Sequence, residues 1–254
     1  MMETIVAVCL LAMMLVSMNI GYRIGHRRKS SDPQTSIEVI GTVDAAVFGL
    51  LGLILAFTFS GASDRLVLRR AQIVQEANAI GTAYLRIDVL AQSDQPAIRE
   101  LFRSYLERRI EAFDKFTDRA ASNAALEKAE QLQRNIWSRS VASCRADPKP
   151  DACLLMLPAL NEMIDITTTR NMATRTHAPS VILMLLILLA LAAGMLSGYA
   201  MSRQPTRSIM HMLLFSLVVS ASVYVVLDLE YPRAEVINLR SMDQALYQLR
   251  ETMK

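Results

Sequence analysis

The sequence predicts an all-α membrane protein, with four transmembrane helices and a helical domain inserted between the second and the third. Apolar residues make up 52% of the 254 residues although 20% are charged, so the apolar residues must gather in blocks. Each of four segments is close to the roughly 20 helical residues that cross a hydrocarbon core about 30 Å thick. These segments contain no Asp, Glu, Lys or Arg, and they are Thr4–Tyr22, Ala45–Ser63, Ala178–Ser202 and Ser208–Leu227.

The four segments divide the chain into parts. We expect residues 1–61 to hold the first two transmembrane helices, 62–178 a water-exposed helical bundle, 179–227 the last two transmembrane helices, and 228–254 a C-terminal tail. The first segment has no positive residue before it and no Ala-x-Ala-like cleavage site, so we expect it to be retained as a helix.

The second apolar segment continues beyond the membrane. Apolar or small residues recur there at steps that keep one helical face dry, which predicts one long helix from about residue 43 to 91. They are Leu66, Ile73, Ala77, Ile80, Tyr84 and Ile87. The inserted bundle is therefore expected to extend the second and third membrane helices.

Three further helices are expected in the insertion. They cover about residues 95–118, residues 123–143 with Ser122 as N-cap, and a stretch from Cys153 toward Pro179; Ser93 is the expected N-cap of the first. Apolar periodicity directs one face of each helix inward, for example Ile98, Phe102 and Tyr105 in the first. In the same helix Arg103, Arg108 and Arg109 are expected to face solvent.

The distribution of Lys and Arg predicts the orientation of the chain. Short cytoplasmic loops carry an excess of both residues, which are present after the first helix at Arg23, Arg27, Arg28 and Lys29 and after the third at Arg203 and Arg207. This places the insertion outside, on the periplasmic side of an inner membrane. Three positive residues on that outer side, Arg65, Arg69 and Arg70, oppose this orientation.

Two cysteines bracket a Pro-containing stretch of the insertion. A disulfide between Cys144 and Cys153 would suit an oxidising compartment and would contribute roughly 2 to 3 kcal/mol by closing a short loop. Two unrelated thiols are the alternative. We expect no metal site, because no histidine or further cysteine lies close in sequence.

Several classes of function have no support in the residues. The net charge of +3 is not gathered into a basic stripe with aromatics, so we expect no nucleic-acid binding. His26, His177 and His211 are isolated, and neither a catalytic constellation nor a Gly-rich phosphate loop is present. We therefore expect no enzyme activity and no cofactor.

Small residues mark two membrane helices. In lipid, helices associate where small residues let their backbones approach. The third helix has Ala190, Gly194 and Gly198 at steps of four, and the second has Gly49, Gly52, Ala56 and Ser60 on roughly one face. Packing within the chain is one interpretation, and a subunit interface or pore-lining strip is the other.

Polar residues near the membrane form two further sets. The fourth helix carries Ser216, Ser220, Tyr224 and Asp228 at steps of four. These side chains either line an aqueous path or form hydrogen bonds between helices. The same two interpretations apply to Thr58 and Ser60 on the second helix. The extension of the second helix carries a dense set that either lines a vestibule around an axis or forms a buried network. Its members are Glu76, Asn78, Thr82, Tyr84 and Arg86.

Four stretches in the right order resemble the bacterial bestrophin-like family of integral membrane proteins, whose function is not established. They are GLLGLILAFTFSGA (49–62), EANAIGTAYLR (76–86), LPALNEM (157–163) and DLEYPR (228–233). Glu230 stands where that family usually has Asp, and Ala234 and Glu235 follow the Pro-Arg pair where a glycine is common. The resemblance suggests a remote link to bestrophins, which are homo-oligomeric anion channels with a cytosolic helical domain, whereas the charge distribution places this insertion outside.

These observations lead to two functional hypotheses. The first is a homo-oligomeric pore for small ions in the lipid bilayer, with the second helix central and an apolar constriction around Leu51 to Phe57. The second is a non-conducting sensor or scaffold whose helical bundle binds a ligand or a protein partner.

Overall fold

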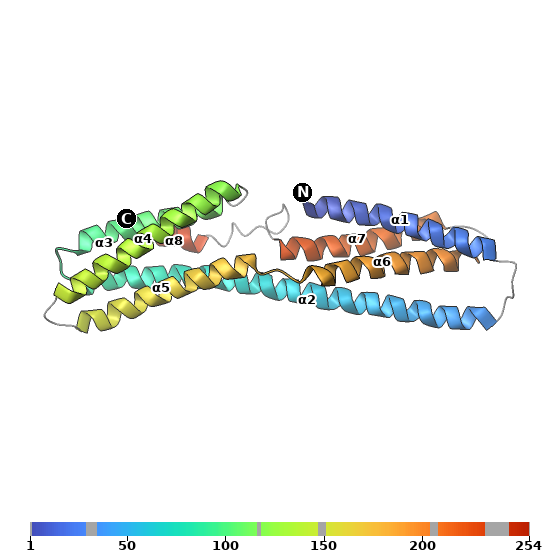
Figure 1. Cartoon of the computed structure of the whole chain (residues 1–254), viewed down its shortest axis with the longest axis horizontal. Helices are drawn as coiled ribbons and strands as arrows, with labels where there is room; N and C mark the ends of the chain where they lie inside the picture. The colour runs from blue at the N-terminus through green and yellow to red at the C-terminus, as the bar shows by residue number, and fades with distance from the viewer. Residues whose placement is uncertain are drawn as a thin grey trace. The chain divides into compact units, whose positions relative to one another are not determined.

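The computed structural model describes residues 2–28, 35–115, 118–146, 151–203, 208–231 and 244–253. Lys29, Arg207, Pro232, Arg233, Ala234 and Glu235, which enter the predictions above, lie outside these ranges. Across the described ranges the chain forms helices and no strand. The helices are α1 Met2–Arg28, α2 Thr35–Leu85, η1 Arg86–Val89, α3 Gln95–Asp114, α4 Arg119–Ala146, α5 Asp151–Arg175, α6 Ser180–Met201, α7 Ile209–Glu230 and α8 Gln244–Thr252 (Figure 1).

Four of the described helical stretches are long and apolar enough to cross a membrane. They are Glu3–Arg27, Gly41–Val89, Ser180–Met201 and Ile209–Glu230. The prediction of an all-α protein with four such helices is therefore confirmed.

The chain divides into two compact units. Unit 1 comprises Met1–Leu66 and His177–Ile237, and unit 2 comprises Val67–Thr176 and Asn238–Lys254. Helix α2 contributes residues to both units. The C-terminal residues predicted as a tail include α8, which belongs to unit 2 and buries Leu246 in its core.

In unit 1, α1, α6 and α7 lie side by side (Figure 1). Glycines on both helices explain how closely α6 packs on α1: a Cβ added at Gly198 of α6 would overlap the Met18 carbonyl group, and one at Gly21 of α1 would overlap that of Met195. Only glycine permits this approach of two backbones. Packing within the chain is thus the role of the small residues on the third membrane helix.

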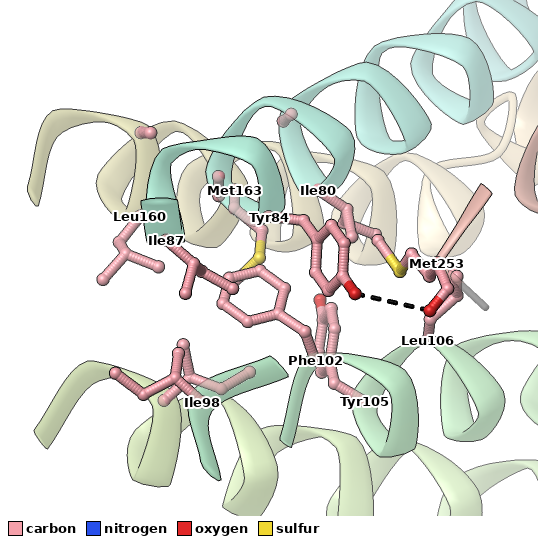
Figure 2. Packing of buried hydrophobic residues seen from close by; sticks show 14 of the residues in the cluster. Ile80, Tyr84, Ile87, Ile98, Phe102, Tyr105, Leu106, Leu160, Met163 and Met253 are labelled. Carbon is pink, nitrogen blue, oxygen red and sulfur yellow. Dashed lines mark hydrogen bonds between the residues drawn. The ribbon is translucent and has the colours of Figure 1, made fainter. Parts of the chain in front are cut away.

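In unit 2, one apolar core joins α2, η1, α3, α4, α5 and α8. Figure 2 shows side chains of α2 and α3 meeting those of α5, with the hydroxyl of Tyr84 donating to the carbonyl oxygen of Met253 at 3.3 Å. The stripe of apolar residues that predicted the long helix supplies the α2 side of this core, because Ile80, Tyr84 and Ile87 are all buried.

Three details differ from the prediction. Helix α2 ends at Leu85 and continues as the 3-10 helix η1. The N-cap of α3 is Asp94 instead of Ser93. Helix α4 begins at Arg119, because Asp118 Oδ1 accepts hydrogen bonds from the amides of Ala120 and Ala121, each at 3.1 Å, which is the geometry of an N-cap.

Arg109 also departs from the prediction. Its side chain was expected in solvent but is 1% exposed. It lies on the buried face of α3 with Ile98, Phe102 and Tyr105, to which it is related by steps of three and four.

Candidate functional site

The membrane portion of α2 exposes its small residues. Gly49, Gly52, Ala56 and Ser60 are all exposed in the single chain, and no other atom lies within 4 Å of a Cβ added at Gly49 or Gly52. These glycines differ from Gly198 of α6, whose space is filled by α1. The small face of α2 therefore has no partner within the described part of unit 1.

The other exposed membrane faces consist mainly of large side chains. On α6 and α7 these include Leu185, Leu188, Leu213, Leu214 and Leu217. Long aliphatic chains of this kind suit lipid, whereas small residues suit another helix. The α2 face thus has the small residues that are typical of a helix–helix interface, yet it is exposed in the single chain.

The extension of α2 in unit 2 has an exposed face of its own. Steps of three and four lead along it from Val67 to Ala71, Val74 and Asn78. All four of these residues are exposed in unit 2. Thr58, by contrast, is half-buried, and its hydroxyl donates to the Ile54 carbonyl oxygen of its own helix at 2.6 Å.

A cluster of charges in unit 1 joins α2 to the end of α7. Glu230 is buried, and its Oε2 accepts hydrogen bonds from Nε and Nη2 of Arg65 at 2.9 and 2.6 Å. Its Oε1 accepts a bond from the Ala178 amide at 2.8 Å and lies 3.5 Å from His177 Nδ1. The His177 ring also packs on Tyr231, with 4.6 Å between ring centroids.

The polar strip of α7 faces the interior of unit 1. Ser216 and Asp228 are buried, and the Ser216 hydroxyl lies 3.4 Å from the Met18 sulfur of α1. Ser220 is buried as well, and Tyr224 is half-buried. Their burial favours a place between helices over an aqueous strip, but the Ser220 hydroxyl has no hydrogen-bond partner among the described residues.

A second cluster of charges lies in the core of unit 2. Glu76 of α2 is fully buried, and its Oε1 accepts a hydrogen bond from Arg109 Nε at 2.6 Å. Its Oε2 pairs with Nη1 of Arg170 from α5. The Arg170 guanidinium also lies over the Phe113 ring, 3.7 Å from its centroid. One carboxylate thus holds two buried guanidinium groups, and α2, α3 and α5 are joined by charge.

Burial and charge act against each other on this cluster. Burial alone would raise the pKa of Glu76, but the nearby guanidinium groups of Arg109 and Arg170 outweigh it and hold the pKa below its ordinary value. Burial would likewise lower the pKa of Arg109, and the Glu76 carboxylate reverses that effect. Burial raises the pKa of the neighbouring Tyr105 to about 12, and its hydroxyl lies 3.1 Å from Thr167 Oγ1.

The remaining members of the predicted polar set of α2 are separated. Tyr84 is buried against Phe102, whereas Asn78 is exposed. Thr82 and Arg86 are half-buried, and Arg86 donates to the Leu155 carbonyl oxygen at 2.7 Å. Glu76 and Tyr84 therefore lie in a buried network, which was the second interpretation of this set, while Asn78 lies on the exposed face.

Sequence reasoning missed the partners of Glu76 and Glu230. Arg109 and Arg170 occupy positions on apolar stripes, the latter three residues after the buried Thr167, and a charge on such a stripe is the signal that could have identified them. Arg65 was treated only as a residue against the predicted orientation. In the structure it neutralises Glu230.

The structure joins Cys144 and Cys153 in a disulfide, with their Cα atoms 5.6 Å apart. This was one of the two alternatives for these residues. Among the described residues, no group of three or more His, Cys, Asp or Glu side chains could hold a metal ion.

Comparison with known proteins identifies the family. The family profile described as the Bestrophin-like domain matches residues 7–240 of the chain. A search of curated proteins and a search of solved structures each found no match. The matched range includes the exposed face of α2 and both clusters of charges. With four helices able to span a bilayer and a match over most of its length, the chain belongs to the bestrophin-like family of membrane proteins.

Proposed function

We propose that the chain assembles as a homo-oligomer in the bilayer and forms a pathway for small ions, with α2 of each copy facing a common axis. The observation that carries this proposal is the exposed small-residue face of α2, formed by Gly49, Gly52, Ala56 and Ser60. In lipid such a face favours close contact with another helix. No helix of the same unit occupies it among the described residues, so a second copy of α2 is the partner that we propose.

The exposed side chains of α2 suit an apolar constriction. Leu51 is buried within unit 1, but Leu53 and Phe57 are 51% and 67% exposed. Apolar side chains around a narrow axis gate ion flow by excluding water. We therefore assign the constriction to Leu53 and Phe57, with Ser60 as a polar position along the path. The proposal gives the chain no catalytic role.

The Gly52→Leu variant tests this proposal. A Cβ added at Gly52 has no neighbour within 4 Å among the described residues, and leucine favours a helix over glycine by about 1 kcal/mol. The variant should therefore fold but fail to pack against a second α2. We expect native mass spectrometry to detect a shift from oligomer to monomer, and ion flux into liposomes to fall at least about tenfold.

A matched control is Val218→Leu, which enlarges an exposed side chain of α7 outside the small face. It should leave both assembly and flux unchanged. Wild-type protein that is monomeric under gentle extraction would contradict the central position of α2. Assembled wild-type protein that passes no ions would contradict conduction.

We further propose that the chain lies in an inner membrane with unit 2 on the periplasmic side. The support is the Arg-rich C-terminal end of α1, with Arg23 and Arg27, and the Cys144–Cys153 disulfide, since disulfides persist outside the reducing cytosol. Two of the three contrary positive residues, Arg65 and Arg69, are engaged within the chain. Arg65 pairs with Glu230, and Arg69 donates to the carbonyl oxygens of Ala173 and Thr176 at 3.3 and 2.8 Å.

A non-conducting sensor is the second candidate function. The observation that favours it is a cavity in unit 2 between the start of α3 and the end of α4, which is lined by opposite charges. A sensor needs a ligand site of this kind, but it does not need several copies of α2 arranged around a common axis. Flux through assembled wild-type protein distinguishes the two functions.

A further inference from the structure

A cavity of about 290 Å³ lies between the N-terminal end of α3 and the last two turns of α4. All of its lining residues belong to unit 2, and none belongs to the Glu76 cluster or to the exposed face of α2. Its volume is near the lower end of the range of small-molecule sites, about 300 to 1,000 Å³. The lining residues are Asp94, Ile98, Arg139, Ala142, Ser143 and Ala146.

Two opposite charges line this cavity without pairing. Asp94 is the N-cap residue of α3, yet its side chain makes no capping hydrogen bond. Neither Asp94 nor Arg139 forms a salt bridge with any residue that the structure describes. Elsewhere in unit 2 exposed charges do pair, as Lys115 does with Glu111 at 2.6 Å. The cavity thus offers one carboxylate and one guanidinium to a bound molecule.

A buried hydroxyl adds a third polar group. Ser143 is 3% exposed, and its Oγ has no hydrogen-bond partner among the described residues. Buried hydroxyl groups almost always have a partner, and a missing one needs an explanation. Since Ser143 also lines the cavity, rotation of its side chain would bring the hydroxyl to a polar atom of a bound molecule, which would supply the missing partner.

The chemistry of these groups selects the ligand. A simple anion would meet the Asp94 carboxylate, and a simple cation would meet the Arg139 guanidinium. A neutral apolar molecule would desolvate both charges without compensation. A small molecule that carries both charges satisfies all three polar groups, and the remaining lining residues, Ile98, Ala142 and Ala146, are apolar.

We propose that this cavity binds a free α-amino acid with an apolar side chain. Arg139 and the Ser143 hydroxyl hold its carboxylate, because a guanidinium donates two parallel hydrogen bonds to such a group. Asp94 accepts hydrogen bonds from its ammonium group. The side chain of the ligand packs on Ile98 and the two alanines. The site is separate from the proposed ion pathway and does not depend on conduction.

Isothermal titration calorimetry of the purified full chain with L-leucine tests the site. We expect saturable binding of one molecule per chain. Asp94→Asn and Arg139→Gln should each weaken binding about tenfold or more, because each leaves one charge of the ligand without its partner. Arg139→Lys should bind better than Arg139→Gln, since it keeps the charge. Arg134→Gln, which removes a positive charge from α4 outside the cavity, should bind as the wild type does.

Smaller probes separate the ligand classes. Acetate and methylamine each carry one of the two charges and should bind much more weakly than L-leucine. The proposal is overturned if L-leucine does not bind, if acetate binds as tightly, or if O-phosphoethanolamine, a lipid headgroup, binds more tightly. Binding that survives both Asp94→Asn and Arg139→Gln overturns it as well. Calorimetry needs no ion flux, so these outcomes are independent of those for the pore.

Discussion

At the residue scale, the buried carboxylate of Glu76 bears on the stability of unit 2. It pairs with Arg109 and Arg170, and its removal would take away the carboxylate that both buried guanidinium groups contact. Breaking a buried ion pair by removing one partner costs about 3 to 5 kcal/mol. We expect Glu76→Gln to lower the thermal midpoint of the protein sharply in a denaturation scan, while Glu162→Gln, an exposed carboxylate on the neighbouring α5, should leave it unchanged.

The same carboxylate makes stability depend on pH. Its folded pKa lies below the ordinary value of 4.5, so its contribution is fully present above about pH 4.5 and is lost as the pH falls through the folded pKa. The wild-type midpoint should therefore fall on acidification below that pH, and Glu76→Gln should show a shallower fall. The pKa of Glu111 is also lowered, by its hydrogen bond to Lys115. The thermal midpoint of the Glu76→Gln variant should therefore still fall somewhat on acidification. Parallel curves for the two proteins would contradict this assignment.

These charges also show which residues a periodic pattern leaves undecided. The apolar steps of α3 predicted Ile98, Phe102 and Tyr105 in the core, and all three are buried. Arg109 follows at the same spacing, but a lone arginine on a helix is ordinarily assigned to solvent. Its carboxylate partner lies 33 positions away on another helix, and only the packing of α2 on α3 brings the two together.

At the element scale, the start of α4 depends on Asp118. Its Oδ1 accepts two amide hydrogen bonds, whereas the expected cap, Ser122, donates to the Ala112 carbonyl oxygen at 2.8 Å instead. Asp118→Ala should destabilise unit 2 by about 1 kcal/mol, within the usual range for the loss of an N-cap. Chemical denaturation would measure it, with Asp118→Asn as the control that keeps the acceptor. Equal stability of Asp118→Ala and wild type would show that another group caps α4.

The helix interfaces in the membrane could be predicted only in part. Small residues at steps of four are present on α6 and on α2, and the sequence alone cannot distinguish a partner within the chain from one outside it. The structure separates them: α1 fills the space beside Gly198, whereas a Cβ added at Gly49 or Gly52 has no neighbour within 4 Å among the described residues. The difference depends on which helices are neighbours, and helix periodicity carries no information on that.

At the scale of the whole molecule, the side of the membrane that holds unit 2 can be tested through its disulfide. We expect Cys144 and Cys153 to resist a membrane-impermeant maleimide in intact cells and to react after an impermeant reductant is added, because the proposed orientation puts both outside the cytosol. A Cys9→Ser background removes the remaining described thiol, and mass spectrometry of the labelled protein provides the measurement. Reaction that requires permeabilised cells would place unit 2 in the cytosol, as in bestrophins.

The sequence by itself determined the helical class, the four apolar spans and the apolar faces of the bundle. These follow from local composition and from the 3.6-residue period, which act within each segment. The tertiary structure decided which charges pair, which glycines have a partner within the chain, and that Asp94, Arg139 and Ser143 line one cavity. Each of these joins residues that are distant in sequence, because a helix fixes the face on which a side chain lies but not the helix that it meets.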